Sequence, residues 1–266
     1  MRSHPAKIFL LRRRHVACLA ALALAAVLFG VVTWPAAVST GTTKRQLPIY
    51  SVERTQPLCS ISFDAAWGNE DTQQLIDILA KYNVKTTFFV VGDWVDKYPE
   101  SVKALHDAGH EVMNHSNHHD HYNSLTADQI IADITACNEK IAAVTGVTPT
   151  LIRCPYGEYD DHVISAIRSM GMEPIQWDVD SLDWKKYDAA TICKRVTDKV
   201  QPGSIVLFHN AALHTPAALP DVLECLIQNG LTVVPISQLI YTENYTIDHT
   251  GRQFAQRQES NPISSS

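Results

Sequence analysis

The stretch Leu58-Cys59-Ser60-Ile61-Ser62-Phe63-Asp64 is mostly apolar and ends in a carboxylate. Two later segments have the same design, because a cluster of histidines follows the run Glu111–Asn114 and His209 closes the run Ile205–Phe208. The strands of a parallel barrel deliver the side chains at their carboxyl ends to one common rim. The three segments therefore predict one active site in which a carboxylate and imidazoles meet, an arrangement typical of a metal-assisted hydrolase.

From Leu58 onward, apolar runs alternate with helical patterns. The predicted strands are Leu58–Asp64, Thr86–Val91, Glu111–Asn114, Leu151–Arg153, Pro174–Trp177, Ser204–His209 and Thr232–Pro235. Helical spacing of apolar residues occurs at Leu75, Ile76, Ile78 and Leu79, at Ile130, Ile134 and Ile141, and at Val163, Ile164 and Ile167. This alternation predicts an α/β fold with a parallel sheet or barrel covered by helices and a site at the carboxyl ends of the strands.

The N-terminus has the features of a membrane anchor. Arg12, Arg13 and Arg14 precede an uncharged stretch over 16–34, which approaches the roughly 20 apolar residues that cross a bilayer. Positive charge before the span predicts a short cytoplasmic segment over 1–15 and a domain outside the cell. The alternative is a secreted protein whose signal peptide is cleaved near Ala37-Val38-Ser39. Because the apolar run exceeds the ~7–15 residues of a signal-peptide core, we favour an uncleaved, single-pass anchor in the cell membrane.

The net charge and the cysteine count of the chain limit which partners and sites are expected. The chain has 266 residues and a net charge of −6 without a basic face, so nucleic acid is not an expected partner. No protein partner is predicted. The five cysteines beyond the span are odd in number and form no CxxC pair, which argues against a disulfide scaffold and a thiolate zinc site. The segment 35–57 is expected to be a polar linker, and 241–266 a loosely ordered polar tail.

The histidine cluster suggests a metal site. His115 and His119 are four residues apart, so on a helix or in a tight loop both imidazoles can face one point. Neutral imidazole suits zinc and similar divalent ions. The alternative is a solvated histidine-rich loop, since His118 and His121 are close by. With Asp64 and His209 elsewhere in the chain, we favour the metal site.

Five motifs occur together in this chain. They are Ser62-Phe63-Asp64, His115-Ser116-Asn117-His118-His119, Arg153-Cys154-Pro155-Tyr156-Gly157, Asp180-Ser181-Leu182-Asp183-Trp184 and Leu207-Phe208-His209. In order and approximate separation they resemble the polysaccharide deacetylases with the NodB homology domain (carbohydrate esterase family 4), over about 58–240. Within that family the chain looks most like the membrane-anchored, sporulation-type branch. The resemblance implies a distorted (β/α) barrel of about seven parallel strands. It also implies a divalent-metal hydrolase, with zinc expected, that removes N-acetyl groups from an aminosugar polymer; peptidoglycan is the expected substrate.

The resemblance also implies roles for the acidic and basic residues. Asp64 corresponds to the general base that activates the attacking water, and Arg153 to the arginine that keeps this carboxylate ionised. His209 corresponds to the general acid that protonates the leaving amine, with Asp180 holding its tautomer. Asp183 competes with Asp180 for that position. Each has a structural alternative: a helix cap for Asp64, a surface ion pair for Arg153 and a buried core histidine for His209.

The substrate pocket is expected to contain three further residues. The backbone N–H of Tyr156 corresponds to the donor that stabilises the oxyanion. Trp184 and Leu207 correspond to residues that line the small pocket for the acetyl methyl group. Both could equally be ordinary core residues.

One position departs from the family pattern. Most members carry a second aspartate, a metal ligand, after the general base, and this chain has Ala65 there. Another side chain (His118, Asp120 or His121) could replace that ligand, water could replace it with weaker metal binding, or the site could have lost metal and activity. Because the acid–base residues are retained, we favour a working enzyme. The alternatives are an inactive wall-binding pseudoenzyme and an O-deacetylase of acetylated polysaccharides.

Overall fold

The structure is a computed structural model in which residues 45–256 are described. The predicted cytoplasmic segment over 1–15 and the predicted membrane span over 16–34 lie outside these residues. Within 45–256, no helix combines the length and apolar character needed to cross a bilayer.

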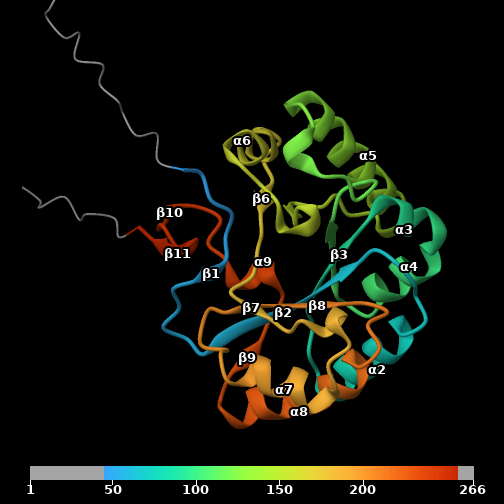
Figure 1. The fold of residues 1–266 in the computed structure, drawn as a ribbon, viewed down its shortest axis with the longest axis vertical. Helices are drawn as coiled ribbons and strands as arrows, with labels where there is room; N and C mark the ends of the chain where they lie inside the picture. The colour runs from blue at the N-terminus through green and yellow to red at the C-terminus, as the bar shows by residue number, and fades with distance from the viewer. Residues whose placement is uncertain (1–44, 257–266) are drawn as a thin grey trace, which may run out of the picture. The chain divides into compact units, whose positions relative to one another are not determined.

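A parallel sheet forms the centre of the domain (Figure 1). Its strand order is β6-β5-β4-β3-β2-β8-β7, and β9 pairs with the first residues of β2. The strands are β2 (Leu58–Ala65), β3 (Thr87–Val90), β4 (Glu111–Asn114), β5 (Leu151–Ile152), β6 (Glu173–Pro174), β7 (Val179–Asp180), β8 (Ile205–His209) and β9 (Thr232–Val233). The path ends at β6 and β7, so the sheet is a half-barrel. The predicted α/β fold with about seven parallel strands is confirmed, and the sheet is an open half-barrel.

Helices follow the strands and cover the sheet. They are α2 (Thr72–Lys81), α3 (Gly92–Lys97), α4 (Pro99–Asp107), α5 (Ala127–Thr145), α6 (Asp161–Ser169), α7 (Ala189–Thr197), α8 (Thr215–Gln228) and α9 (Ile236–Leu239), with the 3₁₀ turns η1 (Tyr122–Ser124), η2 (Pro155–Gly157) and η3 (Asp183–Lys185). Figure 1 shows α5 beside α6 and α7 beside α8 at opposite ends of the sheet. The predicted apolar stripes are buried, as Leu75, Ile130 and Val163 illustrate.

Successive side chains of strand β2 point to opposite faces of the sheet, one apolar and one polar. Ile61, Phe63 and Ala65 belong to one apolar cluster, where Phe63 stacks on Phe88 with ring centroids 4.8 Å apart. Ser62 and Asp64 alternate with them along the strand and bond the guanidinium of Arg153. The buried apolar face thus anchors the strand, and its polar face contributes to the active site.

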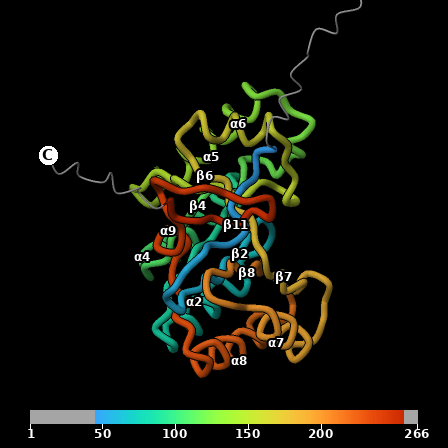
Figure 2. Tube along the Cα trace, turned by 90° about the vertical axis from the view of Figure 1, so that its left-hand side faces the viewer, coloured from blue at the N-terminus to red at the C-terminus, as the bar shows by residue number. Residues whose placement is uncertain are grey.

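The two flanking segments differ from the sequence expectation. Ser51–Val52 (β1), Tyr245–Ile247 (β10) and Arg252–Ala255 (β11) form a second sheet in the order β1-β11-β10. Figure 2 shows the red C-terminal strands beside the blue N-terminal segment. The expectation of a polar linker over 35–57 is therefore wrong for β1, and that of a loosely ordered polar tail over 241–266 is wrong for β10 and β11. These strands are too short to show a hydrophobic period, and they form because distant segments pair.

Candidate active site

The rim at the carboxyl ends of the strands contains a cavity of about 450 Å³. Asp64 is the last residue but one of β2 and His209 is the last of β8, and the two are register partners on neighbouring parallel strands. The segment after β4 supplies the two histidines of the motif. Among the residues predicted for the site, those that line this cavity are Asp64, His115, His119, Tyr156, Asp180, Trp184, Leu207 and His209. The structure therefore brings the separate motifs into one site.

Asp64 is held by a buried ion pair. Its Oδ1 accepts a hydrogen bond from Nη1 of Arg153 at 2.7 Å, and the Arg153 side chain is fully buried. Nη2 of Arg153 donates to the hydroxyl of Ser62 at 2.9 Å. Burial acts to raise the pKa of Asp64, but the charge of Arg153 and its hydrogen bond outweigh it and hold that pKa below its usual value. The pair excludes the surface alternative for Arg153 and keeps Asp64 ionised.

The partner of His209 is Asp183. Nδ1 of His209 donates to Oδ1 of Asp183 at 2.7 Å, and the backbone N–H of His209 donates to the other oxygen of that carboxylate at 2.8 Å. The choice of Asp180 as this partner is wrong, since Asp180 lines the cavity but accepts from the N–H of Leu182. Burial acts to lower the pKa of His209, and the bond to Asp183 and the charge of Asp64 raise it above its usual value.

The loop geometry decides which aspartate reaches His209. Leu182 has φ +54°, a left-handed conformation that reverses the chain between Asp180 and the short turn η3. Asp183 is fully buried there, and its second oxygen also accepts from the hydroxyl of Thr215 at 2.7 Å. The N–H of Trp184 donates to Oδ1 at 2.9 Å, so three donors besides the imidazole hold this carboxylate in place.

His115 is oriented by a backbone group. Its Nδ1 is 2.8 Å from the carbonyl oxygen of Arg153, which can only accept, so Nδ1 carries the proton. Its Nε2 is consequently a free lone pair, 3.5 Å from Oδ2 of Asp64. A histidine that donates one ring nitrogen to a carbonyl and presents the other is typical of metal ligands.

His119 lies beside His115, with ring centroids 5.0 Å apart. It has a left-handed backbone with φ +60°, supported by the bond from its N–H to the hydroxyl of Ser116 at 2.8 Å. Its Nδ1 is buried and has no hydrogen-bond partner among the described residues. Burial and the neighbouring His115 lower the pKa of His119 to about 4, so the ring is a neutral donor at pH 7.

Neutral imidazoles are the kind of donor that holds a divalent ion, and the buried, unpartnered Nδ1 of His119 is the observation that fits such an ion here. A third ligand is missing from the part of the chain that the structure describes, where no group of three or more histidine, cysteine or acidic side chains could hold a metal. Ala65 is buried in the apolar cluster and does not line the cavity. Of the residues predicted for the metal, His115 and His119 are therefore the two that would hold it.

Two of the three proposed replacements for the missing aspartate, His118 and His121, have other partners. Nδ1 of His118 lies 3.0 Å from the carboxylate of Asp93, and its other nitrogen contacts the Asn117 amide. Nδ1 of His121 lies 2.9 Å from Glu158. Both rings are thus engaged by side chains outside the pair formed by His115 and His119.

Aromatic side chains form the walls and the mouth of the cavity. Tyr156 is half exposed and contacts His119 edge to face, with centroids 4.5 Å apart. Trp184 is half exposed and Leu207 is buried, and both line the cavity as expected. The structure adds Trp67 and Trp177, which sequence analysis did not select. The available signal for Trp67 was a tryptophan only three residues after Asp64 in the chain.

Comparison with known proteins places this geometry in a family. The family model for polysaccharide deacetylases matches residues 51–175. The peptidoglycan-N-acetylmuramic acid deacetylase PdaA of Bacillus subtilis is 32% identical over 189 residues, which cover 68% of this chain and 70% of PdaA. The protein YlxY of the same organism is 33% identical over 162 residues, which cover 61% of this chain. The chain spans only about half of YlxY, 51% of its length.

Solved structures agree with this assignment. The carbohydrate esterase family 4 pseudoenzyme BA3943 of Bacillus anthracis matches with a TM-score of 0.71 and 30% identity, covering 80% of this chain and 73% of that protein. A mutant of BA3943 described as having restored enzymatic activity matches at a TM-score of 0.70 and 34% identity, over 73% of this chain and 71% of that protein. With the shared sequence, fold and site motifs, the chain belongs to the polysaccharide deacetylase family.

Proposed function

We propose that this protein is a hydrolase that removes N-acetyl groups from an aminosugar polymer, with peptidoglycan as its substrate. The observation that carries the proposal is that two ion pairs meet at one cavity. Asp64 pairs with Arg153, His209 pairs with Asp183, and both Asp64 and His209 line the cavity. The action on peptidoglycan rests on the similarity to PdaA, whose name states it.

The first couple supplies a base. Asp64 is ionised at neutral pH because the pairing with Arg153 outweighs the effect of burial. Its carboxylate takes the proton from the water that attacks the amide carbonyl, a role worth typically ~10²–10⁴-fold in rate. The backbone N–H of Tyr156 stabilises the oxyanion that forms, while Leu207 and Trp184 enclose the acetyl methyl group.

The second couple supplies an acid. The bond to Asp183 fixes the His209 proton on Nδ1 and favours the imidazolium form, in which Nε2 also carries a proton. His209 gives that proton to the nitrogen of the departing sugar amine. An amine is a poor leaving group, so this donation is necessary for an amide and less important for an ester.

His115 and His119 are the residues that would hold a divalent ion, with zinc expected for imidazole ligands. When bound, the ion supplies positive charge that polarises the amide carbonyl and acidifies the attacking water. The absence of a carboxylate at Ala65 is expected to weaken affinity for the ion.

The cellular placement is part of the same proposal. The anchor over 16–34 would hold the domain over 58–240 outside the cell membrane, next to the wall polymer. Such an anchored domain is what the membrane-anchored, sporulation-type branch of the family would have. The composition of the N-terminus supports this placement.

The test is acetate release by the full-length protein supplied with zinc, from peptidoglycan and from N-acetylglucosamine oligomers. Asp64→Asn and His209→Ala should each lower kcat by about 10²–10⁴-fold with little change in KM. His209→Ala should lower turnover of amides more than that of activated esters. Equal activity of both variants and wild type would contradict the proposal.

A second candidate, an inactive wall-binding pseudoenzyme, is favoured by Ala65 and by the similarity to BA3943. It predicts retained binding of the polymer without acetate release at any metal concentration. An O-deacetylase would instead release acetate from acetylated xylan faster than from the N-acetylated oligomers.

A further inference from the structure

The segment that carries the two metal-site histidines has a strained backbone. Ser116 has φ +73° and His119 has φ +60°, so two non-glycine residues of one short segment adopt the left-handed conformation. Residues with a Cβ rarely adopt this conformation, and it persists only where the surrounding structure enforces it. Contacts from outside the segment must therefore hold His119 in the position where it faces His115.

Two neighbouring elements supply some of these contacts. The N–H groups of Gly92 and Asp93, at the start of α3, donate to the carbonyl oxygens of Ser116 and Asn117 at 2.9 and 3.0 Å. The side chain of Asn114, the last residue of β4, accepts from the N–H of Ser116 at 2.7 Å. These bonds leave the N–H of Asn117, midway between the two histidines in the chain, to a third element.

A carboxylate from α5 bonds that N–H. Oδ2 of Asp133 accepts from the N–H of Asn117 at 2.7 Å, and the same oxygen accepts from the hydroxyl of Tyr122 at 2.7 Å. Asn117 and Tyr122 are both buried, so water does not readily replace the carboxylate as their partner. A hydrogen bond from a backbone N–H to a carboxylate is roughly twice as strong as one to a neutral acceptor. Asp133 is thus a firm anchor for the middle of the histidine segment.

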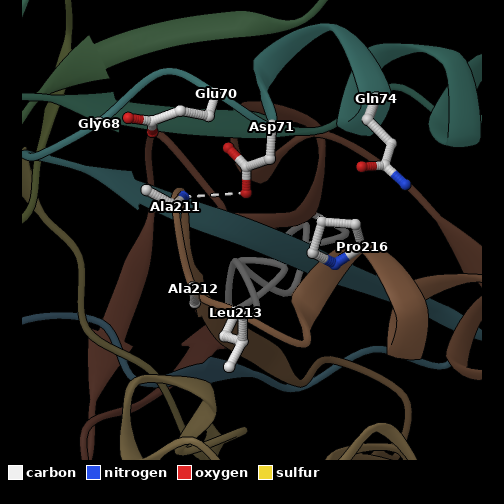
Figure 3. Close-up of a pocket in the computed structure, with 8 residues that line it drawn as sticks. All are labelled: Gly68, Glu70, Asp71, Gln74, Ala211, Ala212, Leu213 and Pro216. Atoms are coloured by element: carbon white, nitrogen blue, oxygen red, sulfur yellow. Dashed lines mark hydrogen bonds between the residues drawn. The ribbon is translucent and has the colours of Figure 1, made fainter.

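The segment after β8 is held in the same way, but it carries neither histidine of the metal site. Ala211 has φ +54°, and Oδ2 of Asp71 accepts from its N–H at 2.9 Å, the dashed line in Figure 3. Asp71 directly precedes α2, whereas Asp133 lies on α5. In both places an aspartate of a helical element bonds a backbone N–H of a segment with left-handed residues. The bond of Asp71 therefore provides a matched comparison for that of Asp133.

We infer that Asp133 is a positioning residue of the active site, which keeps His119 facing His115 by fixing the backbone of Asn117 between them. The two imidazole rings lie with centroids 5.0 Å apart only while the chain keeps its left-handed turns. Without the bond to Asp133 the segment relaxes, and the ring of His119 leaves the place where an ion would bind. Asp133 does not line the cavity, so it acts through the backbone and not on the substrate. The inference rests on the proposed function for the divalent ion.

A purely structural role for Asp133 would act through Tyr122 instead. The ring of Tyr122 belongs to the same apolar cluster as Ile130 and Ile134 of α5, so its bond to Asp133 also joins the turn η1 to this helix. Loss of that bond would lower the stability of the domain without a specific effect on 115–119. The two roles therefore differ in which residues move when Asp133 is replaced.

The zinc affinity of the full-length protein separates the two roles, measured by competition with a chromophoric chelator. Asp133→Ala should weaken zinc binding about tenfold, the lower end of the effects of groups that orient metal ligands. Asp133→Asn removes the charge but keeps the shape and an acceptor oxygen, so its affinity should stay within about threefold of wild type. Tyr122→Phe removes the other bond of the same oxygen, and Asp71→Ala removes the matched bond after β8. Both should bind zinc as wild type does.

Hydrogen exchange of the metal-free protein gives a readout that does not depend on zinc. Asp133→Ala should exchange the amide hydrogens of 115–119 at least about tenfold faster than wild type, while the protection of α5 stays unchanged. If Asp133→Ala does not fold, it is replaced by the double variant Asp133→Ala with Tyr122→Phe, which also removes the hydroxyl that would lack a partner.

Wild-type zinc affinity or wild-type exchange of 115–119 in Asp133→Ala would overturn the inference. An equal loss of zinc affinity in Asp133→Ala and Tyr122→Phe would overturn it as well, because the bond to Tyr122 would then explain the effect. If wild type binds no zinc, the exchange of 115–119 decides. A protein that releases no acetate but shows these differences rejects only the proposed function, whereas an active enzyme without them rejects only this inference.

Discussion

At the scale of single residues, Asp183 decides the protonation of His209. Asp183→Asn keeps the shape of the side chain but removes the negative charge, so kcat should fall by about 10²-fold or more with little change in KM. Asp180→Asn should have a smaller effect, because Asp180 bonds the N–H of Leu182 instead. Steady-state kinetics of the two variants at pH 7 measure the difference. A larger loss in Asp180→Asn would assign the partner role to that residue.

The two histidines of the candidate metal site make a separate prediction. His115→Ala and His119→Ala should each deplete the purified protein of zinc, because each removes one of two imidazole ligands. His118→Ala is the matched control, since its ring contacts Asp93 outside the site. Elemental analysis after dialysis measures the stoichiometry. Full zinc content in the first two variants would place the ion elsewhere.

At the scale of helices and strands, two glycines with a left-handed backbone lie next to the ends of elements. Gly251, before β11, has φ +83°, and a Cβ there would collide with the ring of Tyr50. Gly230, after α8, has φ +77° with nothing near its Cβ position. Gly230→Ala should therefore lower the free energy of unfolding by about 1–2 kcal/mol from the backbone alone.

Gly251→Ala should lower it further, by an additional ~1–3 kcal/mol, because the collision displaces Tyr50. Urea unfolding with unchanged m-values provides the comparison. Equal losses in the two variants would mean that β1 and β11 contribute little to the packing of the domain.

At the scale of the whole molecule, stability should depend on pH through buried neutral histidines. His110 is 4% exposed, and burial lowers its pKa from 6.5 to about 4. The unfolded chain thus binds a proton between these values and the folded protein does not. The contribution of His110 is complete above pH 6.5 and is lost as the pH falls toward 4, by about 3 kcal/mol over that interval.

Chemical denaturation of wild type and His110→Asn at pH 7 and pH 4.5 measures this dependence. The variant should lose less stability between the two pH values than wild type. His249→Asn, at an exposed position, is the matched control and should behave as wild type. A pH dependence in His110→Asn as steep as in wild type would contradict the prediction.

Much of the fold could be predicted from the chain alone, where local patterns are long. The stripe that includes Leu75 and Leu79 and the run of β2 correspond to the observed elements, because burial of one face requires these periods. The two-residue strands β1 and β7 have no detectable period. The small sheet in particular needs Arg252 to lie beside Ser51, a contact across about two hundred residues.

The sequence by itself determined the residue types of the site and the strand ends that deliver them, because a side chain at the carboxyl end of a parallel strand must reach the rim. Only the tertiary structure decided which groups touch. Asp180 and Asp183 are three residues apart, and the left-handed Leu182 between them selects the one that meets His209. In the same way, Asp64 and His209 line one cavity because β2 and β8 pair in parallel, which brings two segments distant in sequence side by side.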